Sequence, residues 1–363
     1  MFSAEDYQHM ARAIQLAKRP VQAPHPNPRV GCVIVKNGLV IGQGFHHKAG
    51  QAHAEVNALK DAGNEAIGAT VYVTLEPCAH TGKTPPCAEA LIKAKVKKVI
   101  VAMVDPNPKV AGKGMDMLQE AGIQTASGLL QDQAENLNLG FIKRMRTGLP
   151  WVRCKIAMSV DGRTAMANGE SQWITGPAAR QDVQYWRANA DAIVTGSGTV
   201  IADDPRLTVR DIPVDEIRQP VKVVVDGQLK VSPNATLFSQ SGRVILASLA
   251  AANESNYSKN ASFLKLSEKN GHVDLAILLK ELGGKEINEV HLEAGARLND
   301  AFLVENLVDE IVIYAAPSLM GHQARPIFLL ENIHSMKDQY LLECTDIRHV
   351  GKDIRFIYRK KHN

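Results

Sequence analysis

Metal-binding side chains in the first quarter of the chain constrain its folding more than any other feature. His53-Ala54-Glu55 is followed by Pro77-Cys78, and Cys87 comes nine residues after Cys78. One imidazole and two thiolates form a three-ligand set for Zn²⁺ and leave the fourth tetrahedral position open for water. Glu55 is close enough in sequence to handle the protons of that water without binding the metal. We therefore expect the chain to fold around one Zn²⁺ held by His53, Cys78 and Cys87, with Glu55 as the catalytic residue.

The sequence around these residues favours convergence on one ion. Val71–Leu75 is expected to be a buried strand that ends shortly before Cys78. Cys87 follows two prolines and is expected to begin a helix, where unpaired backbone N–H groups favour a thiolate. His53 is expected to open another helix, which places Glu55 in its first turn.

A zinc ion used only for folding is the alternative. Structural zinc sites usually have four protein ligands, and His80 stands two residues after Cys78. Glu55 would then be an ordinary surface carboxylate. Three ligands with a nearby glutamate that does not bind the metal are typical of zinc deaminases of nucleobases, so the catalytic interpretation is favoured. The other cysteines are interpreted as small core residues: Cys32, Cys154 and Cys344.

Length and composition indicate two domains and a reducing compartment. The chain has 363 residues, and Thr147-Gly148-Leu149-Pro150 interrupts the expected elements, so we expect one domain over 1–147 and another over 148–363. The odd number of cysteines, two of them assigned to a metal, favours the cytoplasm. No stretch reads as a signal peptide or membrane span, so no membrane partner is expected.

Both domains are expected to alternate helices and strands, which predicts an α/β fold with a sheet layered by helices. In the first domain we expect a helix from Ala4 to Pro20, a hairpin of Val30–Val35 and Leu39–Gly42, helices at His53–Lys60 and Cys87–Lys95, and strands at Val71–Leu75 and Val99–Val104. In the second we expect a helix at Ala178–Ala190 and strands at Val152–Met158, Ala192–Thr195, Val221–Val225, Val244–Ala247, Val290–Leu292 and Glu310–Ala315.

Four segments of the first domain together resemble the deaminase half of bacterial bifunctional riboflavin-biosynthesis enzymes. They are His25–Val35, His53–Leu59, Thr74–Cys87 and Asp105–Pro108, and the long spacer between the cysteines distinguishes this family from cytidine and tRNA-adenosine deaminases. The resemblance implies a cytidine-deaminase-like domain that deaminates 2,5-diamino-6-(ribosylamino)pyrimidin-4-one 5′-phosphate. It also implies contacts to this phosphorylated ribosylaminopyrimidine from Asn27, His80, Lys83 and Thr84. On the residues alone, Asn27 between two prolines is equally well explained as a turn residue.

Five segments of the second domain resemble the reductase half of the same enzymes. They are Ser159–Ala165, Gly169–Ile174, Thr195–Val200, Asp203–Arg210 and Glu293–Ala296. The resemblance implies a dihydrofolate-reductase-like domain in which NADPH reduces the ribosyl group of 5-amino-6-(5-phosphoribosylamino)uracil to ribityl. The implied cofactor contacts are Ala157, Trp173, Thr199, Asp203, Gly227, Gly295, Ala296 and Arg297. The implied substrate contacts are Lys155, Ser171, Arg187, Leu207, Arg210 and Glu293.

Two of these substrate contacts also have a physical rationale. Arg187 and Arg210 suit a phosphate because a guanidinium can bind it through two parallel hydrogen bonds. The alternatives are a surface ion pair on a helix for Arg187 and a solvent-facing charge for Arg210. Leu207–Arg210 is expected to be strand-like, with Leu207 and Val209 on one face and the alternate residues on the other.

Two other functions compete with this interpretation. A nucleic-acid-editing deaminase would favour a basic stripe or an aromatic stacking surface, whereas aromatic residues make up 5% of this chain and its net charge is +4. We therefore expect no nucleic-acid partner. A zinc-stabilised scaffold without catalysis would leave Glu55 without a role. We expect the enzyme to be a homo-oligomer.

Overall fold

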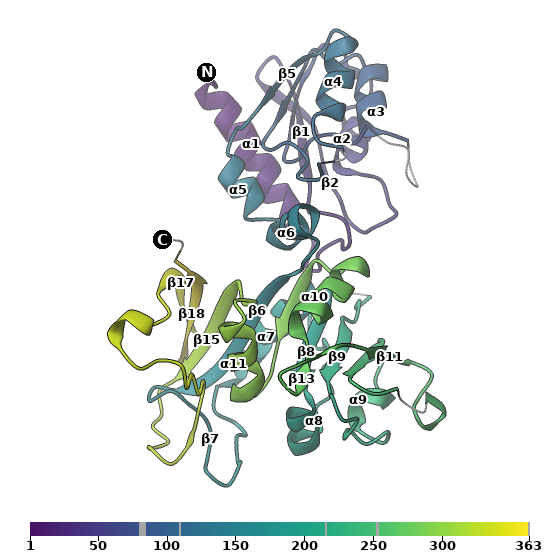
Figure 1. The fold of residues 1–363 in the computed structure, drawn as a ribbon. Coiled ribbons are helices and arrows are strands. Elements are labelled where there is room, and N and C mark those ends of the chain that lie inside the picture. Colours follow the sequence, from purple (N-terminus) through teal and green to yellow (C-terminus); the bar gives the residue numbers. More distant parts are fainter. Residues whose placement is uncertain (80–84, 109, 215, 252–253, 362–363) are drawn as a thin grey trace. The chain divides into compact units, whose positions relative to one another are not determined.

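Two separate sheets organise the chain (Figure 1). The computed structural model describes residues 1–79, 85–108, 110–214, 216–251 and 254–361. Contacts within the chain divide it into two units, Met1–Gly148 and Leu149–Asn363. None of the helices within the described ranges is long and apolar enough to cross a bilayer.

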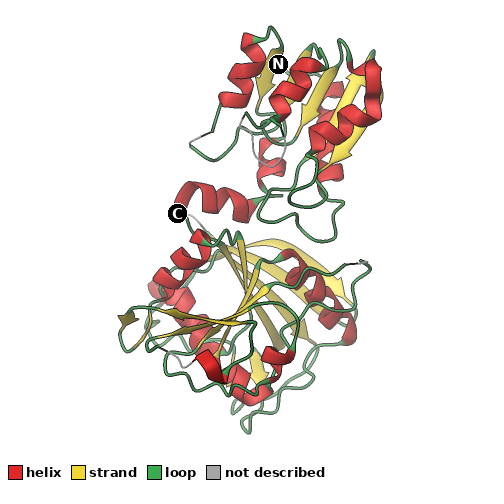
Figure 2. Cartoon of the chain, turned by 90° about the vertical axis from the view of Figure 1, so that its right-hand side faces the viewer, coloured by secondary structure: helices red, strands yellow, loops and turns green. Residues whose placement is uncertain are grey.

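The first unit has a sheet with helices on both faces (Figure 2). Its described residues form five strands in the order β2-β1-β3-β4-β5, in which β1 is antiparallel to β2 and β3, and β3, β4 and β5 are parallel. The strands are β1 (Gly31–Lys36), β2 (Leu39–Phe45), β3 (Thr70–Val73), β4 (Lys98–Val101) and β5 (Gln124–Ser127). The helices are α1 (Ala4–Ala17), α2 (Ala54–Ala62), η1 (Gly63–Ala66), α3 (Cys87–Lys93), α4 (Lys113–Glu120), α5 (Gln131–Glu135) and α6 (Leu139–Thr147).

Alternation along the strands builds a separate core on each face of this sheet. Val71 and Val73 of β3 pack with α2, α3 and α4, whereas Tyr72 packs on the opposite face with α1, α5 and α6. The expected elements of this unit are present, with ends shifted by a few residues. The sequence did not predict α4, α5, α6 and β5. The N-cap residues of these three helices form no side-chain capping hydrogen bond, and β5 has no buried residue, so each lacks the usual signal of its element.

The second unit has a larger sheet that is mainly parallel. The described residues form nine strands in the order β11-β10-β9-β8-β14-β6-β15-β18-β17, and only β18 and β17 join it in antiparallel fashion. These strands are β6 (Trp151–Ser159), β8 (Ala192–Gly196), β9 (Val221–Val225), β10 (Val244–Ser248), β11 (Ala261–Lys265), β14 (Glu289–Leu292), β15 (Glu310–Ala316), β17 (Leu342–Val350) and β18 (Asp353–Lys360).

Helices and two small sheets complete the second unit. The helices are α7 (Pro177–Asn189), α8 (Ser197–Asp203), α9 (Thr236–Ser239), η2 (Glu254–Asn256), α10 (Leu275–Gly284), α11 (Ala296–Val304) and η3 (Met336–Asp338). The small sheets pair β7 (Arg163–Ala165) with β16 (Arg325–Pro326) and β12 (Glu268–Lys269) with β13 (His272–Val273). All the strands expected in this half are present, and α7 matches its expected range within one residue.

The C-terminal hairpin of β17 and β18 was not expected, and it corrects one interpretation. Cys32 and Cys154 are core residues, as predicted. The prediction for Cys344 is wrong, because this residue is exposed on β17 at the edge of the sheet. Most side chains of β17 are exposed, so its sequence lacks the alternation of buried and exposed residues that marks an ordinary strand.

The expected strand-like conformation of Leu207–Arg210 is also wrong. Leu207 has a positive φ of 49°, and the segment belongs to neither a strand nor a helix. The amide and carbonyl of Val209 are instead paired with the side chain of Gln219, at 2.8 Å each. Leu207 and Val209 are both buried, as expected, but Thr208 is buried too and does not share an exposed face with Arg210.

Two glycines of β2 let helix α2 lie unusually close to the sheet. A Cβ at Gly42 would lie 2.5 Å from the carbonyl oxygen of Ala58, and a Cβ at Gly44 would lie 2.5 Å from that of Ala54. The absence of side chains here allows direct contact between the strand and the helix backbone. This contact sets the position of the first turn of α2, which carries Glu55.

Gly44→Ala is expected to destabilise the first unit by about 1–3 kcal/mol, because the new methyl group must displace α2. Far-UV circular dichroism during urea unfolding measures this change. The three tryptophans, Trp151, Trp173 and Trp186, all lie in the second unit, so their fluorescence should report an unchanged transition. Gly284→Ala, where a Cβ meets open space, is the control. An unaltered circular dichroism transition in Gly44→Ala would contradict the prediction.

Candidate metal centre and reductase site

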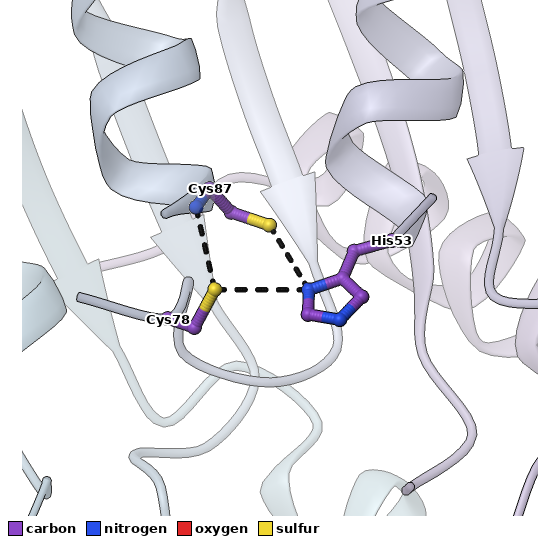
Figure 3. A group of neighbouring side chains, drawn as sticks. All are labelled: His53, Cys78 and Cys87. Atoms are coloured by element: carbon purple, nitrogen blue, oxygen red, sulfur yellow. Dashed lines mark hydrogen bonds between the residues drawn. The ribbon is translucent and has the colours of Figure 1, made fainter. Parts of the chain in front are cut away.

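Three residues from separate elements of the first unit meet at one point. His53 is the N-cap residue of α2, Cys78 follows β3, and Cys87 is the first residue of α3. Figure 3 shows the imidazole and the two sulfur atoms pointing toward one another. In the part of the chain that the structure describes, their ligand atoms all lie within 4.8 Å of one another.

The distances between these atoms suit a zinc ion. Nδ1 of His53 lies 3.7 Å from Sγ of Cys78 and 3.2 Å from Sγ of Cys87. Ligands about 2.0–2.3 Å from a tetrahedral zinc ion are roughly 3.6 Å from one another. The donor set therefore fits Zn²⁺, with Nδ1 as the ligand atom of His53.

The surroundings of Cys78 favour its thiolate form, which is the form that binds metal. Hydrogen bonds from the side chain and the backbone N–H of Cys87 and from His53 lower the pKa of Cys78 to about 4, against the opposing effect of burial. The backbone N–H of Cys87 is 3.3 Å from Sγ of Cys78. The same pairing with Cys78 raises the pKa of His53. These contacts hold an ionised sulfur at the start of α3, as expected for a ligand.

Glu55 lies beside the ligands in a buried position. Its residue surface is 3% exposed, and it belongs to the first turn of α2. Burial raises the pKa of the Glu55 carboxyl group to about 7, and the Cys87 thiol forms a hydrogen bond with it. A carboxyl group with a pKa near neutrality can both accept and release protons, as a general acid–base catalyst must.

Asn27 is joined to the metal centre through a histidine that the sequence analysis missed. Nδ2 of Asn27 lies 3.1 Å from Nε2 of His46, and Nδ1 of His46 lies 3.1 Å from the carbonyl oxygen of Ala52. The carbonyl requires a proton on Nδ1, so Nε2 accepts from Asn27. The His46 ring also meets the His53 ring edge-on at 5.1 Å. Burial lowers the pKa of His46, which favours the neutral ring.

His46 could have been noticed in the sequence as a polar residue directly after the apolar strand Leu39–Phe45. Three other residues predicted to contact the deaminase substrate lie outside the described residues: His80, Lys83 and Thr84.

A second polar cluster lies in the second unit and brings together three predicted substrate residues. Lys155 is on β6, Arg187 is in the last turn of α7, and Glu293 follows β14. Nε and Nη2 of Arg187 donate to the two carboxylate oxygens of Glu293, at 2.6 and 2.8 Å. Although burial opposes ionisation, Arg187 holds the pKa of Glu293 well below its usual range. Burial lowers the pKa of Lys155, which is close enough to interact electrostatically with both residues.

The guanidinium of Arg187 forms hydrogen bonds with two protein partners. Its guanidinium fork is occupied by Glu293, and its Nη1 donates to the carbonyl oxygen of Thr208 at 3.1 Å. The alternative of a surface ion pair is wrong in its position, because Arg187 and Glu293 form an ion pair that is largely buried. Arg210 is different: its side chain is 46% exposed, and its nearest carboxylate is Asp211 at 3.9 Å.

His291, on β14, was also missed by the sequence analysis. The residue is fully buried, and its Nε2 lies 3.4 Å from a carboxylate oxygen of Glu293. Burial and, to a lesser extent, the neighbouring Arg153 and Arg187 lower the pKa of His291 to about 3 against the effect of Glu293, so the ring is neutral. A histidine within the apolar run Val290–Leu292 was the available signal.

The predicted cofactor residues lie on or after neighbouring parallel strands. Strands β9, β8, β14 and β6 are adjacent in that order. Ala157 is on β6, Gly227 follows β9, and Gly295 follows β14 as the N-cap residue of α11. The others belong to α8 or the first turn of α11: Thr199, Asp203, Ala296 and Arg297. Connections after parallel strands meet at the carboxyl edge of a sheet, where open α/β folds bind nucleotides.

Ser171 and Trp173 lie in the segment between β7 and α7. Trp173 is 67% exposed, and the guanidinium of Arg180 stacks on its ring at 4.6 Å from the centroid. Nη1 of Arg180 also donates to the carbonyl oxygen of Thr175 at 2.7 Å. Arg180 therefore supports an exposed aromatic face at the start of α7.

Two family models match the chain. The cytidine and deoxycytidylate deaminase zinc-binding region matches residues 3–103, and the RibD C-terminal domain matches residues 150–356. The riboflavin biosynthesis protein RibD of Escherichia coli is 48% identical over 360 residues, covering 96% of this chain and 98% of that protein. The protein of the same name from Haemophilus influenzae is 48% identical over 370 residues, covering 99% of each chain.

Solved structures agree over nearly the whole length. RibD of Acinetobacter baumannii has a TM-score of 0.93 and 47% identity, with 99% of each chain covered. A diaminohydroxyphosphoribosylaminopyrimidine deaminase/5-amino-6-(5-phosphoribosylamino)uracil reductase of Thermotoga maritima has a TM-score of 0.87 and 30% identity, covering 98% of this chain and 99% of that one. The expected pairing of a cytidine-deaminase-like domain with a dihydrofolate-reductase-like domain is confirmed. The chain therefore belongs to the RibD family of bifunctional deaminase/reductases of riboflavin biosynthesis.

Proposed function

We propose that the first unit deaminates 2,5-diamino-6-(ribosylamino)pyrimidin-4-one 5′-phosphate at an exocyclic amine. In the second unit, NADPH then reduces the ribosyl group of the product, 5-amino-6-(5-phosphoribosylamino)uracil, to ribityl. The observation that carries this proposal is the convergence of His53, Cys78 and Cys87 beside buried Glu55. Ammonia release and NADPH consumption by the purified protein, supplied with the diaminopyrimidinone phosphate, test both activities together.

Each of the described residues near the metal centre has a role in the proposed deamination. His53, Cys78 and Cys87 would hold Zn²⁺, which when bound lowers the pKa of water from 15.7 to about 7 and so supplies hydroxide at neutral pH. Glu55 accepts the proton that the water releases and delivers it to a ring nitrogen, and then assists the departure of ammonia. Asn27, oriented by His46, contacts the pyrimidine. The amine leaves as ammonia, and the water oxygen becomes the new carbonyl oxygen.

The reductase step takes place beside Lys155 and Glu293. NADPH, when bound, would supply a hydride to ribosyl C1′; the bond between C1′ and the ring oxygen breaks, and that oxygen takes a proton from solvent. Lys155 binds near C1′, and Glu293, held in place by Arg187 and ionised, contacts the sugar. Arg210 is the better candidate for the phosphate, because its guanidinium is half exposed and is not held in a bidentate pair.

Support for NADPH comes from two strand ends. Gly295 begins the nine-residue helix α11 without a capping side chain, so the first backbone N–H groups are free of a cap and suit a pyrophosphate. Asp226, directly after β9, is buried and accepts hydrogen bonds from the backbone N–H groups of Lys230 and Val231. It is therefore not free to bind the ribose 2′-hydroxyl of NADH. The proposal also includes a homo-oligomeric state and, from the odd number of cysteines, a location in the cytoplasm.

Glu55→Gln is expected to lower deamination by about 10²–10⁴-fold, because an amide cannot transfer the protons. Bound zinc, measured by metal analysis, should stay at one ion per chain, and reductase turnover should not change. Glu65→Gln, which alters an exposed carboxylate that pairs with Lys36, serves as the matched control. Full deaminase activity in Glu55→Gln would exclude the proposed proton transfer.

Arg210→Ala is expected to raise the reductase KM for the phosphorylated substrate by roughly ten- to a hundredfold. The reason is the loss of a charge-assisted hydrogen bond worth about 1.5–3 kcal/mol. The KM for NADPH and the rate of deamination should stay the same. Asp211→Ala removes only the surface partner of Arg210 and should have little effect. Unchanged reductase kinetics in Arg210→Ala would instead assign this residue to the solvated surface.

The reductase is expected to prefer NADPH to NADH by about tenfold or more in kcat/KM, the difference that one charge-assisted contact to the 2′-phosphate supplies. Steady-state rates with each cofactor at a fixed substrate concentration measure the preference. Equal values of kcat/KM would refute this choice of cofactor while leaving the reductase assignment in place.

A further inference from the structure

Glu76 is a buried carboxylate near the metal centre that has no role in the steps described above. Only 5% of its residue surface is exposed. Its Oε1 accepts hydrogen bonds from the backbone N–H groups of Gly114 and Met115, at 2.8 and 3.3 Å. Its Oε2 accepts from the backbone N–H groups of Asp105 and Gly112, each at 3.0 Å. One side chain thus satisfies four backbone donors, which compensates the cost of burying a charge.

These contacts show that Glu76 caps helix α4 from another part of the chain. The N-cap residue of α4 is Gly112, which has a left-handed conformation and no side chain to form a cap. Gly114 and Met115 are the second and third residues of the helix, the positions whose N–H groups an N-cap side chain normally accepts. The negative charge of Glu76 also interacts favourably with the positive end of the helix dipole.

The same contact holds the segment that carries a metal ligand. Glu76 is separated from Cys78 only by Pro77, whose carbonyl oxygen would lie 1.9 Å from a Cβ at Gly114. On the other side, the backbone N–H of Glu76 donates to the carbonyl oxygen of Met103 at 3.0 Å, and the carbonyl oxygen of Cys78 accepts from Ala88 at 3.2 Å. Segment 76–78 is therefore fixed between the residues that follow β4, helix α3 and helix α4.

We propose that Glu76 is a positioning residue of the metal centre, which docks the start of α4 against the Pro77–Cys78 turn and so aims Sγ of Cys78 at His53 and Cys87. The proposal rests on the zinc site of the proposed function and deepens it. The side chain of Cys78 has few ways to move once its backbone is held on both sides. Without the carboxylate, the turn gains freedom, and part of the zinc-binding free energy must be used to order it.

The four donors require a carboxylate in particular. Each oxygen of Glu76 accepts two N–H groups. An amide in its place would direct its NH₂ group at two backbone donors, whichever way it turned, and would leave them without an acceptor. Glu76→Gln therefore disrupts the contact with almost no change in shape.

Competition with a chromogenic zinc chelator tests the proposal in a way that does not depend on activity. The Kd for zinc of Glu76→Gln should be about 10- to 100-fold weaker than that of the unmodified protein, as for other residues that orient metal ligands. The measurement is made at a temperature at which far-UV circular dichroism shows both proteins folded. Glu120→Gln, at the exposed far end of α4, is the matched control and should retain the normal Kd.

A purely structural role gives a different result, because it lowers the unfolding temperature while the folded protein keeps its normal Kd for zinc. That outcome would overturn the proposal. If Glu76→Gln does not fold, Glu76→Asp is the test variant, because it keeps the charge but moves it back by one methylene group. Glu76→Asp should also weaken zinc binding. Failure of the unmodified protein to bind zinc would instead refute the proposed function. Reductase turnover in each variant reports the integrity of the second unit.

Discussion

The free backbone N–H groups at helix starts are the feature on which both candidate sites depend. The first backbone N–H groups of a helix have no partner within it, so they attract anions and ionised ligands. Cys87 uses this position on α3, and the backbone N–H of Cys87 also stabilises the sulfur of Cys78. In the second unit, Gly196 and Gly295 begin α8 and α11 in the same way, after β8 and β14. One feature of backbone geometry thus suits a metal ligand in one unit and a nucleotide in the other.

Three carboxyl groups are buried near the two candidate sites, and each has different surroundings. Glu76 is satisfied by four backbone donors and has a structural task. Glu293 is ionised because Arg187 donates to both of its oxygens. Glu55 has no bidentate arginine among its described contacts, and burial raises its pKa toward neutrality although the charge of His53 opposes this shift. The three carboxylates are chemically alike, and only their surroundings distinguish the proposed proton carrier from the two that hold structural contacts.

Much of the site was accessible from the sequence because its elements are local. His53, Cys78 and Cys87 each stand at an expected strand end or helix start, and the structure brings them together as predicted. The partnership of Arg187 and Glu293 could not be predicted, because the residues are far apart in the chain and each looks like a free substrate contact. The contact of Gln219 could not be predicted from the sequence either. Its side chain forms hydrogen bonds with the backbone of Val209, and such a contact produces no periodic pattern of apolar residues.

The spacing of residues and the alternation of apolar and polar positions predicted the candidate metal ligands and the two-part α/β organisation, and the quoted motifs predicted the family, because all three are properties of the chain. The tertiary structure decided which charged groups are shielded from water and what they face. In the folded chain, Glu55 is buried and the guanidinium of Arg187 pairs with the carboxylate of Glu293. Glu76 accepts hydrogen bonds at the start of a helix that begins more than thirty residues later in the chain. Desolvation and hydrogen bonding depend on neighbours in space, and these exist only once the sheet has brought distant segments together.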